Sequence, residues 1–194
     1  MTSRKPRHRT IEIAGVDGAG KTTLTKMLAS HLGFEGCKMD PFSDDFHRRL
    51  TYLRDNLGQR SVDAARSMAL GLCILREIAE QDGPRVYDRH LESARMWWSV
   101  MGISPLPEEV LETIPEPDLV VFLDIDPEVA AQRMLRSRME SDVIRQQFGA
   151  RCIEYLRSMA LRRDWIVVDA TAPLDVVWPQ ILDAVESRMV PGVS

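Results

Sequence analysis

The sequence has few cysteines and no long apolar stretch, and both absences narrow the classes of protein to which it can belong. Its three cysteines, Cys37, Cys73 and Cys152, show no C-x-x-C spacing, so neither a disulfide framework nor a zinc site is predicted. No run of 18 apolar residues occurs, and the first residues contain no apolar segment of signal-peptide length. We therefore expect a cytoplasmic protein without a membrane partner.

A broad excess of positive charge is also missing. The formal net charge is −4 over 194 residues, which argues against a nucleic-acid partner. Basic residues crowd only positions 1–9, which we interpret as a flexible basic leader. Residues 10–190 then have the length of one compact domain with a single active site.

Apolar, β-rich runs alternate with segments of helical period, a pattern that predicts an α/β fold with a parallel sheet. We expect strands at 11–14, 37–39, 85–87, 119–123 and 165–168. Helices are expected at 21–32, 44–57, 62–81, 126–138 and, as the last one, 141–162. Residues 102–117 are rich in proline and are interpreted as a surface excursion.

The strongest motif lies between the first strand and the first helix, where residues 15–22 match G-x-x-x-x-G-K-[ST], the phosphate-binding loop or P-loop. Its glycines let main-chain amides converge on phosphate oxygens at the start of a helix. Lys21 is expected to bridge the β- and γ-phosphates of ATP, and the Thr22 hydroxyl to bind Mg²⁺. The predicted ATP-binding residues are Gly15, Asp17, Gly18, Ala19, Gly20, Lys21, Thr22 and Thr23.

A P-loop specifies a nucleoside triphosphate but not a reaction. The sequence has no Asn-Lys pair, so it lacks the N-K-x-D element of GTPases, and no second ATPase signature is present. Asp88 and Arg89 end an apolar strand, where open α/β sheets bind ligands. There an acid can hold Mg²⁺ through water and an arginine can clamp a phosphate. Asp124 ends another apolar strand, and the residues alone do not choose between the two acids.

Several of these segments resemble the thymidylate kinase family. The stretch 11–24, IEIAGVDGAGKTTL, is similar to the P-loop of that family, and Asp88-Arg89-His90 with Ser93 resembles its D-R-[YFH]-x-x-S element. Residues 117–124 and 165–170 resemble its fourth and last strands. The resemblance implies a three-layer P-loop fold with a five-stranded parallel sheet and a lid. It also implies that Asp17 approaches the acceptor sugar, Arg89 its 5′-phosphate, and Asp88 the Mg²⁺.

The resemblance further places a lid at about residues 133–147. Phosphoryl transfer depends mainly on positive charge around the transferring group. Members of the family can carry an arginine in the P-loop, but Gly18 and Ala19 stand there in this chain. The lid arginines Arg133, Arg136 and Arg138 are therefore expected to supply the charge.

The acceptor side departs from the family pattern. After the second strand the chain reads Met39-Asp40-Pro41-Phe42, without the arginine that the family has there, and Trp97-Trp98 replace a Tyr-Gln pair. These differences leave the base open. The expected substrate-binding residues are Asp17, Asp40, Phe42, Arg48, Arg66, Asp88, Arg89 and Trp97.

Three functions remain as hypotheses. The first is a kinase that phosphorylates a pyrimidine nucleoside monophosphate, dTMP or a relative, with ATP and Mg²⁺. The second is a nucleoside 5′-hydroxyl kinase in which Asp40 acts as general base. The third is a nucleotide-binding regulator without activity. A homodimer is expected because proteins of this kind commonly form one.

Overall fold

Five strands form one parallel sheet in the computed structural model, which describes residues 9–38, 55–103, 112, 114–136 and 143–189. The strands are β1 Thr10–Ala14, β2 Glu35–Lys38, β3 Arg85–Asp88, β4 Leu119–Asp124 and β5 Ile166–Asp169. Their order in the sheet is β2-β3-β1-β4-β5. The expected α/β class and five-stranded parallel sheet are confirmed.

The first strand lies at the centre of this sheet and fixes the level of its neighbours. Ile11 is in register with Val86 of β3 and with Leu119 of β4. The chain segments that follow β1, β3 and β4 therefore leave the sheet at the same edge. This carboxyl edge is the place where parallel α/β sheets bind ligands.

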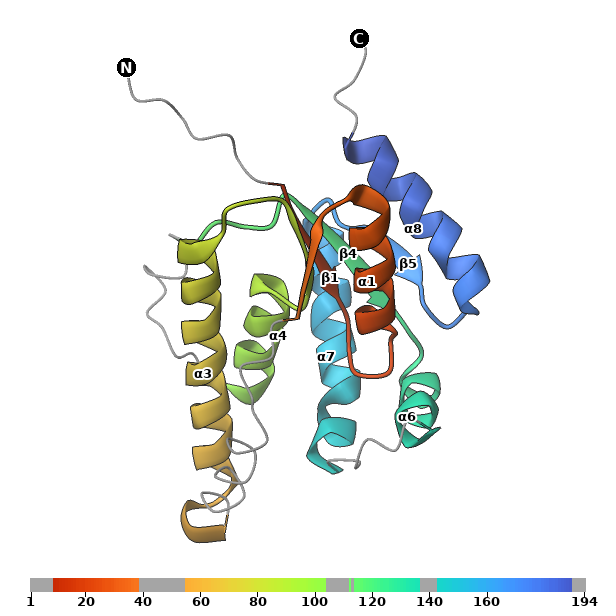
Figure 1. Ribbon diagram of the computed structural model, residues 1–194. Coiled ribbons are helices and arrows are strands. Elements are labelled where there is room, and N and C mark those ends of the chain that lie inside the picture. The colour runs from red at the N-terminus through yellow and green to blue at the C-terminus, as the bar shows by residue number, and fades with distance from the viewer. Residues whose placement is uncertain (1–8, 39–54, 104–111, 113, 137–142, 190–194) are drawn as a thin grey trace, which may run out of the picture.

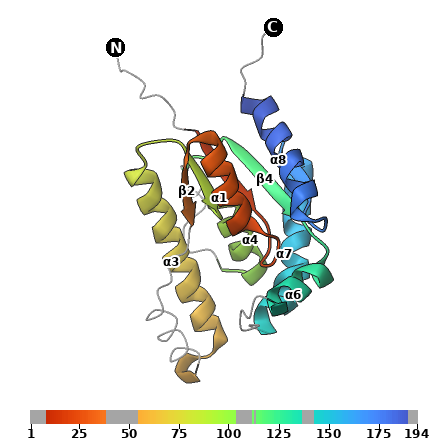
Figure 2. The same ribbon diagram turned by 45° about the vertical axis from the view of Figure 1, so that its right-hand side comes forward.

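Helices cover both faces of the sheet. They are α1 Lys21–Leu32, α3 Gln59–Glu80, α4 Leu91–Met101, α6 Pro127–Arg136, α7 Val143–Arg162 and α8 Leu174–Met189. In both views α1 and α8 lie in front of the sheet and α4 and α7 behind it (Figures 1 and 2). The long helix α3 stands at the β2 side and contacts α4. The three layers enclose the core.

The core consists of two apolar clusters. The larger one joins the sheet to α1, α7 and α8 and includes Ile13, Leu28, Phe122 and Ile181, none of them exposed. The smaller one lies between β3, α3 and α4, with Ile74 and Tyr87 at its centre. Burial of such side chains contributes roughly 1.5–3 kcal/mol each.

Two helices were not expected from the sequence. Helix α8 follows β5, so 141–162 does not contain the last helix. It carries Pro179 in its interior, which interrupts the helical pattern. The buried residues Val177, Ile181 and Val185 nevertheless follow each other at i, i+4 and i+8. Packing of this stripe on the sheet therefore outweighs the hydrogen bond that the proline removes.

Helix α4 was not predicted, because its sequence offers no local cap at His90 and follows directly on the end of a strand. Other expectations differ in detail. Strand β2 begins at Glu35, two residues earlier than expected. Ile114, in the expected surface excursion, is buried against the smaller cluster. Of the helix expected at 44–57, only residues 55–57 are described, and they are helical.

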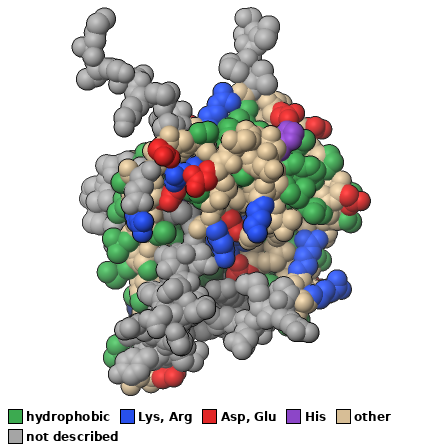
Figure 3. Space-filling model, in the orientation of Figure 1, with side chains coloured by type: hydrophobic (Ala, Val, Ile, Leu, Met, Phe, Trp, Pro, Cys, Tyr) green, Lys and Arg blue, Asp and Glu red, His purple; other side chains and the backbone are tan. Residues whose placement is uncertain are grey.

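The described residues contain no helix with the length and apolarity that a bilayer crossing requires. On the face seen in Figure 3, lysine and arginine side chains lie among aspartate and glutamate side chains, and the described surface there forms no broad patch of one sign.

Helix α6 packs directly on the loop that follows β1. Gly18 in this loop has φ +84°, and a Cβ atom built there would lie 2.4 Å from the Ala130 carbonyl oxygen of α6. A side chain at this position would thus meet backbone, which cannot rotate away. Gly33, which follows α1, also has a left-handed φ of +67°, but nothing lies within 4 Å of its Cβ position.

We predict that Gly18→Ala destabilises the fold by more than Gly33→Ala. Both variants place a side chain at a positive φ, a strain of roughly 1–2 kcal/mol, but only Gly18→Ala displaces α6. Urea unfolding of the two variants and the wild type measures the difference. Equal losses of stability would show that α6 does not constrain the loop.

Candidate active site

The loop from Gly15 to Gly20 opens α1 without a capping side chain. The N-cap residue is Gly20, with φ +94°. As a glycine, it has no side chain that could cap the helix. The first amides of a helix have no partner within the helix, and they carry a partial positive charge. Because the N-cap glycine offers them no side chain, these amides are positioned to bind an anion such as a phosphate.

Lys21 lies across this loop. Its side chain is buried, and its Nζ donates a hydrogen bond of 2.7 Å to the Val16 carbonyl and lies 3.9 Å from Asp17 Oδ1. The ammonium group is thus held by the loop itself, next to the start of α1. Little movement is needed for it to meet a polyphosphate bound there.

Thr22 and Asp88 meet at the carboxyl edge of the sheet. The Thr22 hydroxyl donates a hydrogen bond to Asp88 Oδ2. Asp88 is buried, and its other oxygen, Oδ1, has no hydrogen-bond partner among the described residues. A hydroxyl beside a carboxylate with an unused oxygen suits Mg²⁺, which prefers oxygen ligands and retains several waters.

Arg89 adopts a left-handed backbone conformation with φ +71°, unlike every other described residue except glycines. Such a conformation costs of order 1–3 kcal/mol in a non-glycine residue. Its Nη2 forms an ion pair with Asp17, whereas the buried Nη1 has no hydrogen-bond partner in the described part of the chain.

The charge of Arg89 is maintained despite burial. Burial lowers the pKa of Arg89, but Asp17 and Asp88 raise that pKa by more. An arginine that is charged, oriented by one carboxylate and left with an unused donor can bind a phosphate group at this edge.

Asp124 ends β4, but its carboxylate contacts α7. Both of its carboxylate oxygens accept hydrogen bonds from Arg157 Nε of α7, at 2.9 and 3.0 Å. Of the two acids that the sequence left open, Asp88 is therefore the one that faces Thr22.

The predicted lid arginines have different positions. Arg133 donates to the carbonyl oxygens of Ala170, Thr171 and Ala172, at 2.7, 3.0 and 3.3 Å. These contacts give Arg133 a structural role, because they hold the turn that follows β5. Arg136 ends α6 and is exposed, and Arg138 lies outside the described residues. That these arginines supply charge to the transferred group stays a prediction.

The predicted acceptor residues are only partly described. Arg66 is half-buried on α3, and Trp97 on α4 packs against the larger core cluster. Trp98, its neighbour, belongs instead to the smaller cluster between α3 and α4. Thr23 is exposed on the first turn of α1. Asp40, Phe42 and Arg48 lie outside the described residues.

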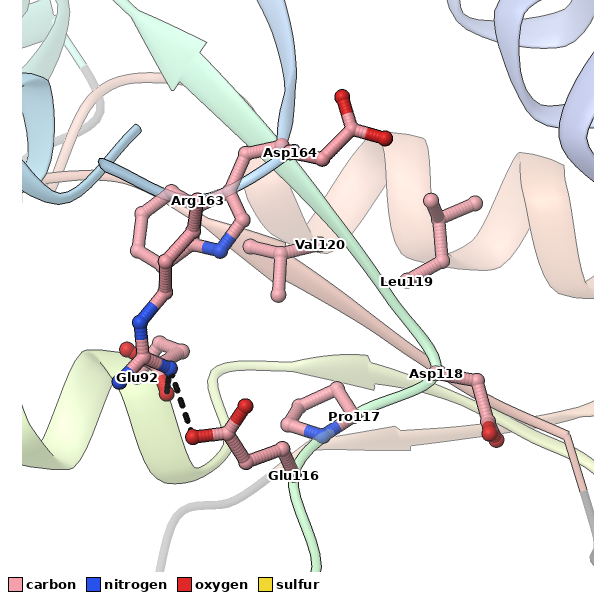
Figure 4. Close-up of a pocket in the computed structure, with 9 residues that line it drawn as sticks. Glu92, Glu116, Pro117, Asp118, Leu119, Val120, Arg163 and Asp164 are labelled. Carbon is pink, nitrogen blue, oxygen red and sulfur yellow. Dashed lines mark hydrogen bonds and ion pairs between the residues drawn. The ribbon is translucent and has the colours of Figure 1, made fainter. Parts of the chain in front are cut away.

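A cavity of about 370 Å³ lies at the amino ends of β4 and β5, at the opposite edge of the sheet from the P-loop (Figure 4). Arg163 reaches into this region and contacts Glu92 and Glu116, at 3.0 and 2.9 Å. This cavity is separate from the candidate active site.

One buried acidic residue near the site, Glu12, was not predicted from the sequence. Glu12, in the middle of β1, has no exposed surface, and its carboxylate contacts the start of α4. The available signal was an acidic residue between Ile11 and Ile13 in a strand expected to be buried.

Comparison with known proteins places this geometry in a family. The thymidylate kinase family pattern matches residues 64–181, a stretch that includes Asp88 and Arg89. A probable thymidylate kinase of Archaeoglobus fulgidus is 28% identical over 200 residues, which cover 91% of this chain and 94% of that one.

Solved structures share the fold. The thymidylate kinase of Candida albicans has a TM-score of 0.69 at 20% identity and covers 94% of this chain and 92% of its own. A deoxyadenosine kinase from M. mycoides with bound dATP has a TM-score of 0.68 at 16% identity and covers 92% and 100%. The family match extends over more than half of the sequence, and the chain thus belongs to the thymidylate kinase family of phosphotransferases.

Proposed function

We propose that this protein transfers the γ-phosphoryl group of MgATP to the 5′-phosphate of a pyrimidine deoxynucleotide, with dTMP as the first candidate. The observation that carries the proposal is the pairing of a P-loop with Arg89, whose buried Nη1 has no hydrogen-bond partner among the described residues while its Nη2 pairs with Asp17. Membership of the thymidylate kinase family supports dTMP as acceptor.

The residues divide the work between donor and acceptor. The amides at the start of α1 and Lys21 bind the β- and γ-phosphates of ATP. Arg89 binds the acceptor phosphate, and Asp17 holds the arginine in place and faces the acceptor sugar. The acceptor phosphate is already a nucleophile at neutral pH, so no general base is required.

Thr22 and Asp88 are proposed to hold Mg²⁺. The fit rests on the Thr22 hydroxyl and on Asp88 Oδ1, the buried oxygen without a partner among the described residues. When bound, the ion neutralises charge on the phosphate oxygens during transfer. We further propose that residues 133–147 form a lid, in which Arg136 and Arg138 add positive charge.

The nucleoside kinase hypothesis requires Asp40 as general base, and Asp40 lies outside the described residues. The likeness to deoxyadenosine kinase concerns the fold alone, at 16% identity. Arg89 gives the monophosphate hypothesis more support, because a nucleoside offers no phosphate for its unused donor.

We propose a homodimer in the cytoplasm. Met68 and Leu72, one turn apart on α3, are 58% and 65% exposed. Leu57, two residues before the start of α3, is 66% exposed. An apolar stripe of this kind suits contact with a second copy. No disulfide joins the described cysteines, which fits a reducing compartment. Light scattering should give a mass near twice 22.0 kDa, and Leu72→Glu should lower it towards that of one chain.

The function is tested by measuring ADP release from ATP against a panel of nucleosides and their 5′-monophosphates, with and without Mg²⁺. We expect turnover with dTMP and no turnover with thymidine, because Arg89 requires a phosphate. Chelation of Mg²⁺ by EDTA should abolish the activity. Turnover of nucleosides alone would favour the Asp40 mechanism, and nucleotide binding without any turnover would favour a regulator.

Arg89→Ala should lower kcat/KM for dTMP by about 10²- to 10³-fold, the usual loss for one donor aimed at developing charge, and should raise the acceptor KM. Arg163→Ala serves as the matched control. It removes an arginine from the carboxylate of Glu92, but at the cavity beside the amino ends of β4 and β5, away from the P-loop. A wild-type kcat/KM in Arg89→Ala would remove Arg89 from the site.

A further inference from the structure

A buried carboxylate links β1 to the element that carries Arg89. Glu12 lies two residues before the end of β1, and its side chain has no exposed surface. A buried carboxylate is costly unless hydrogen bonds replace those that it loses from water. The pKa of Glu12 is raised above its ordinary value, because the effect of burial outweighs the hydrogen bonds from Ser93 and from main-chain amides, which lower it.

Four donors from the start of α4 surround this carboxylate. Oε1 accepts from the His90 amide at 3.0 Å, the Ser93 amide at 2.8 Å and the Ser93 hydroxyl at 2.7 Å. Oε2 accepts from the Glu92 amide at 2.9 Å. Three amides donate to the two oxygens, which is the environment of an ionised carboxylate at a helix amino terminus.

This cap of α4 comes from a strand, β1, and not from α4 itself. The N-cap residue of α4, His90, makes no side-chain capping hydrogen bond. Helices are usually capped by a Ser, Thr, Asp or Asn at that position. A local cap would stabilise α4 equally well, but it would not fix where α4 begins relative to β1.

The turn at Arg89 is thereby held on both sides by neighbouring residues of β1. The Arg89 amide points to the Ile13 carbonyl at 3.4 Å, and the next amide, of His90, donates to Glu12. Arg89 itself has the strained φ of +71°. Gly15, the first residue of the P-loop, follows Glu12 by only three positions.

We propose that Glu12 is a positioning residue for the acceptor phosphate. By holding the amides of His90, Glu92 and Ser93, it keeps Arg89 in the left-handed conformation that directs the guanidinium to Asp17. Glu12 touches no substrate and acts through Arg89. One strand then sets the distance between the P-loop and the arginine. The proposal rests on the role of Arg89 in the proposed function.

The test is Glu12→Gln, which keeps the volume but replaces one acceptor oxygen by an amide group that faces donors. We expect kcat/KM for dTMP to fall by about 10- to 100-fold with a raised acceptor KM, whereas the Kd for ATP changes less than about threefold. The reason is that the Glu12 carboxylate accepts these four hydrogen bonds from His90 and the start of α4, and none of the donors belongs to the P-loop.

Glu92→Gln is the matched control. Glu92 is equally buried and lies in the turn of α4 that Glu12 caps, but its carboxylate contacts Arg163 at 3.0 Å (Figure 4). It also contacts Arg95 at 2.7 Å. We expect this variant to lose thermal stability and keep the wild-type acceptor KM. An equal rise of the acceptor KM in both variants would show that Glu12 acts only on stability.

A double-variant cycle separates positioning from general destabilisation. If Glu12 acts through Arg89, adding Glu12→Gln to Arg89→Ala should lower kcat/KM for dTMP by less than about twofold. If the double variant loses as much as the product of the two single losses in kcat/KM, the proposal is contradicted.

A crystal structure of Glu12→Gln supplies a readout that does not depend on activity. We expect φ of Arg89 to leave the left-handed region and the ion pair with Asp17 to be lost. An unchanged φ and ion pair would refute the positioning role, whether or not dTMP is the substrate. If the wild type turns over no monophosphate, the proposed function fails, and this structure still decides the role of Glu12.

Discussion

The pairing of β1 with β3 on one side and β4 on the other is the constraint on which the site depends. Because the three strands are parallel and in register, the segments that follow them emerge at one edge of the sheet. Thr22 and Asp88, 66 residues apart in sequence, meet there through a hydrogen bond. In the proposed function, the P-loop binds polyphosphate, and the end of β3 supplies the groups for metal and acceptor.

The charged groups of the site compensate one another before any substrate binds. Lys21 contacts the Val16 carbonyl, and Arg89 pairs with Asp17. Buried charges require such partners, since an unpaired charge away from water costs several kcal/mol. At the candidate site, Asp88 Oδ1 and Arg89 Nη1 have no hydrogen-bond partner among the described residues. A cation and a phosphate are the partners that we propose for these two atoms.

Much of the fold could be predicted because local patterns encode it. The P-loop lies between β1 and α1 as its motif requires, and α1 has the expected bounds of Lys21–Leu32. Helix α8 could not be recognised, because Pro179 interrupts the pattern that packing on the sheet then overrides. Helix α4 begins where Glu12 caps it, and no local sequence signal identifies a cap supplied by another strand.

The sequence by itself determined the chemistry of the P-loop, the parallel α/β class and the pair of residues, Asp88 and Arg89, at a strand end. These features depend on residue types at fixed short spacing, which the chain carries locally. Only the tertiary structure decided that Asp88 and not Asp124 faces Thr22, that Arg133 holds the turn after β5, and that Glu12 reaches α4. Each of these is a contact between segments far apart in sequence, whose partners are chosen by strand order and helix packing.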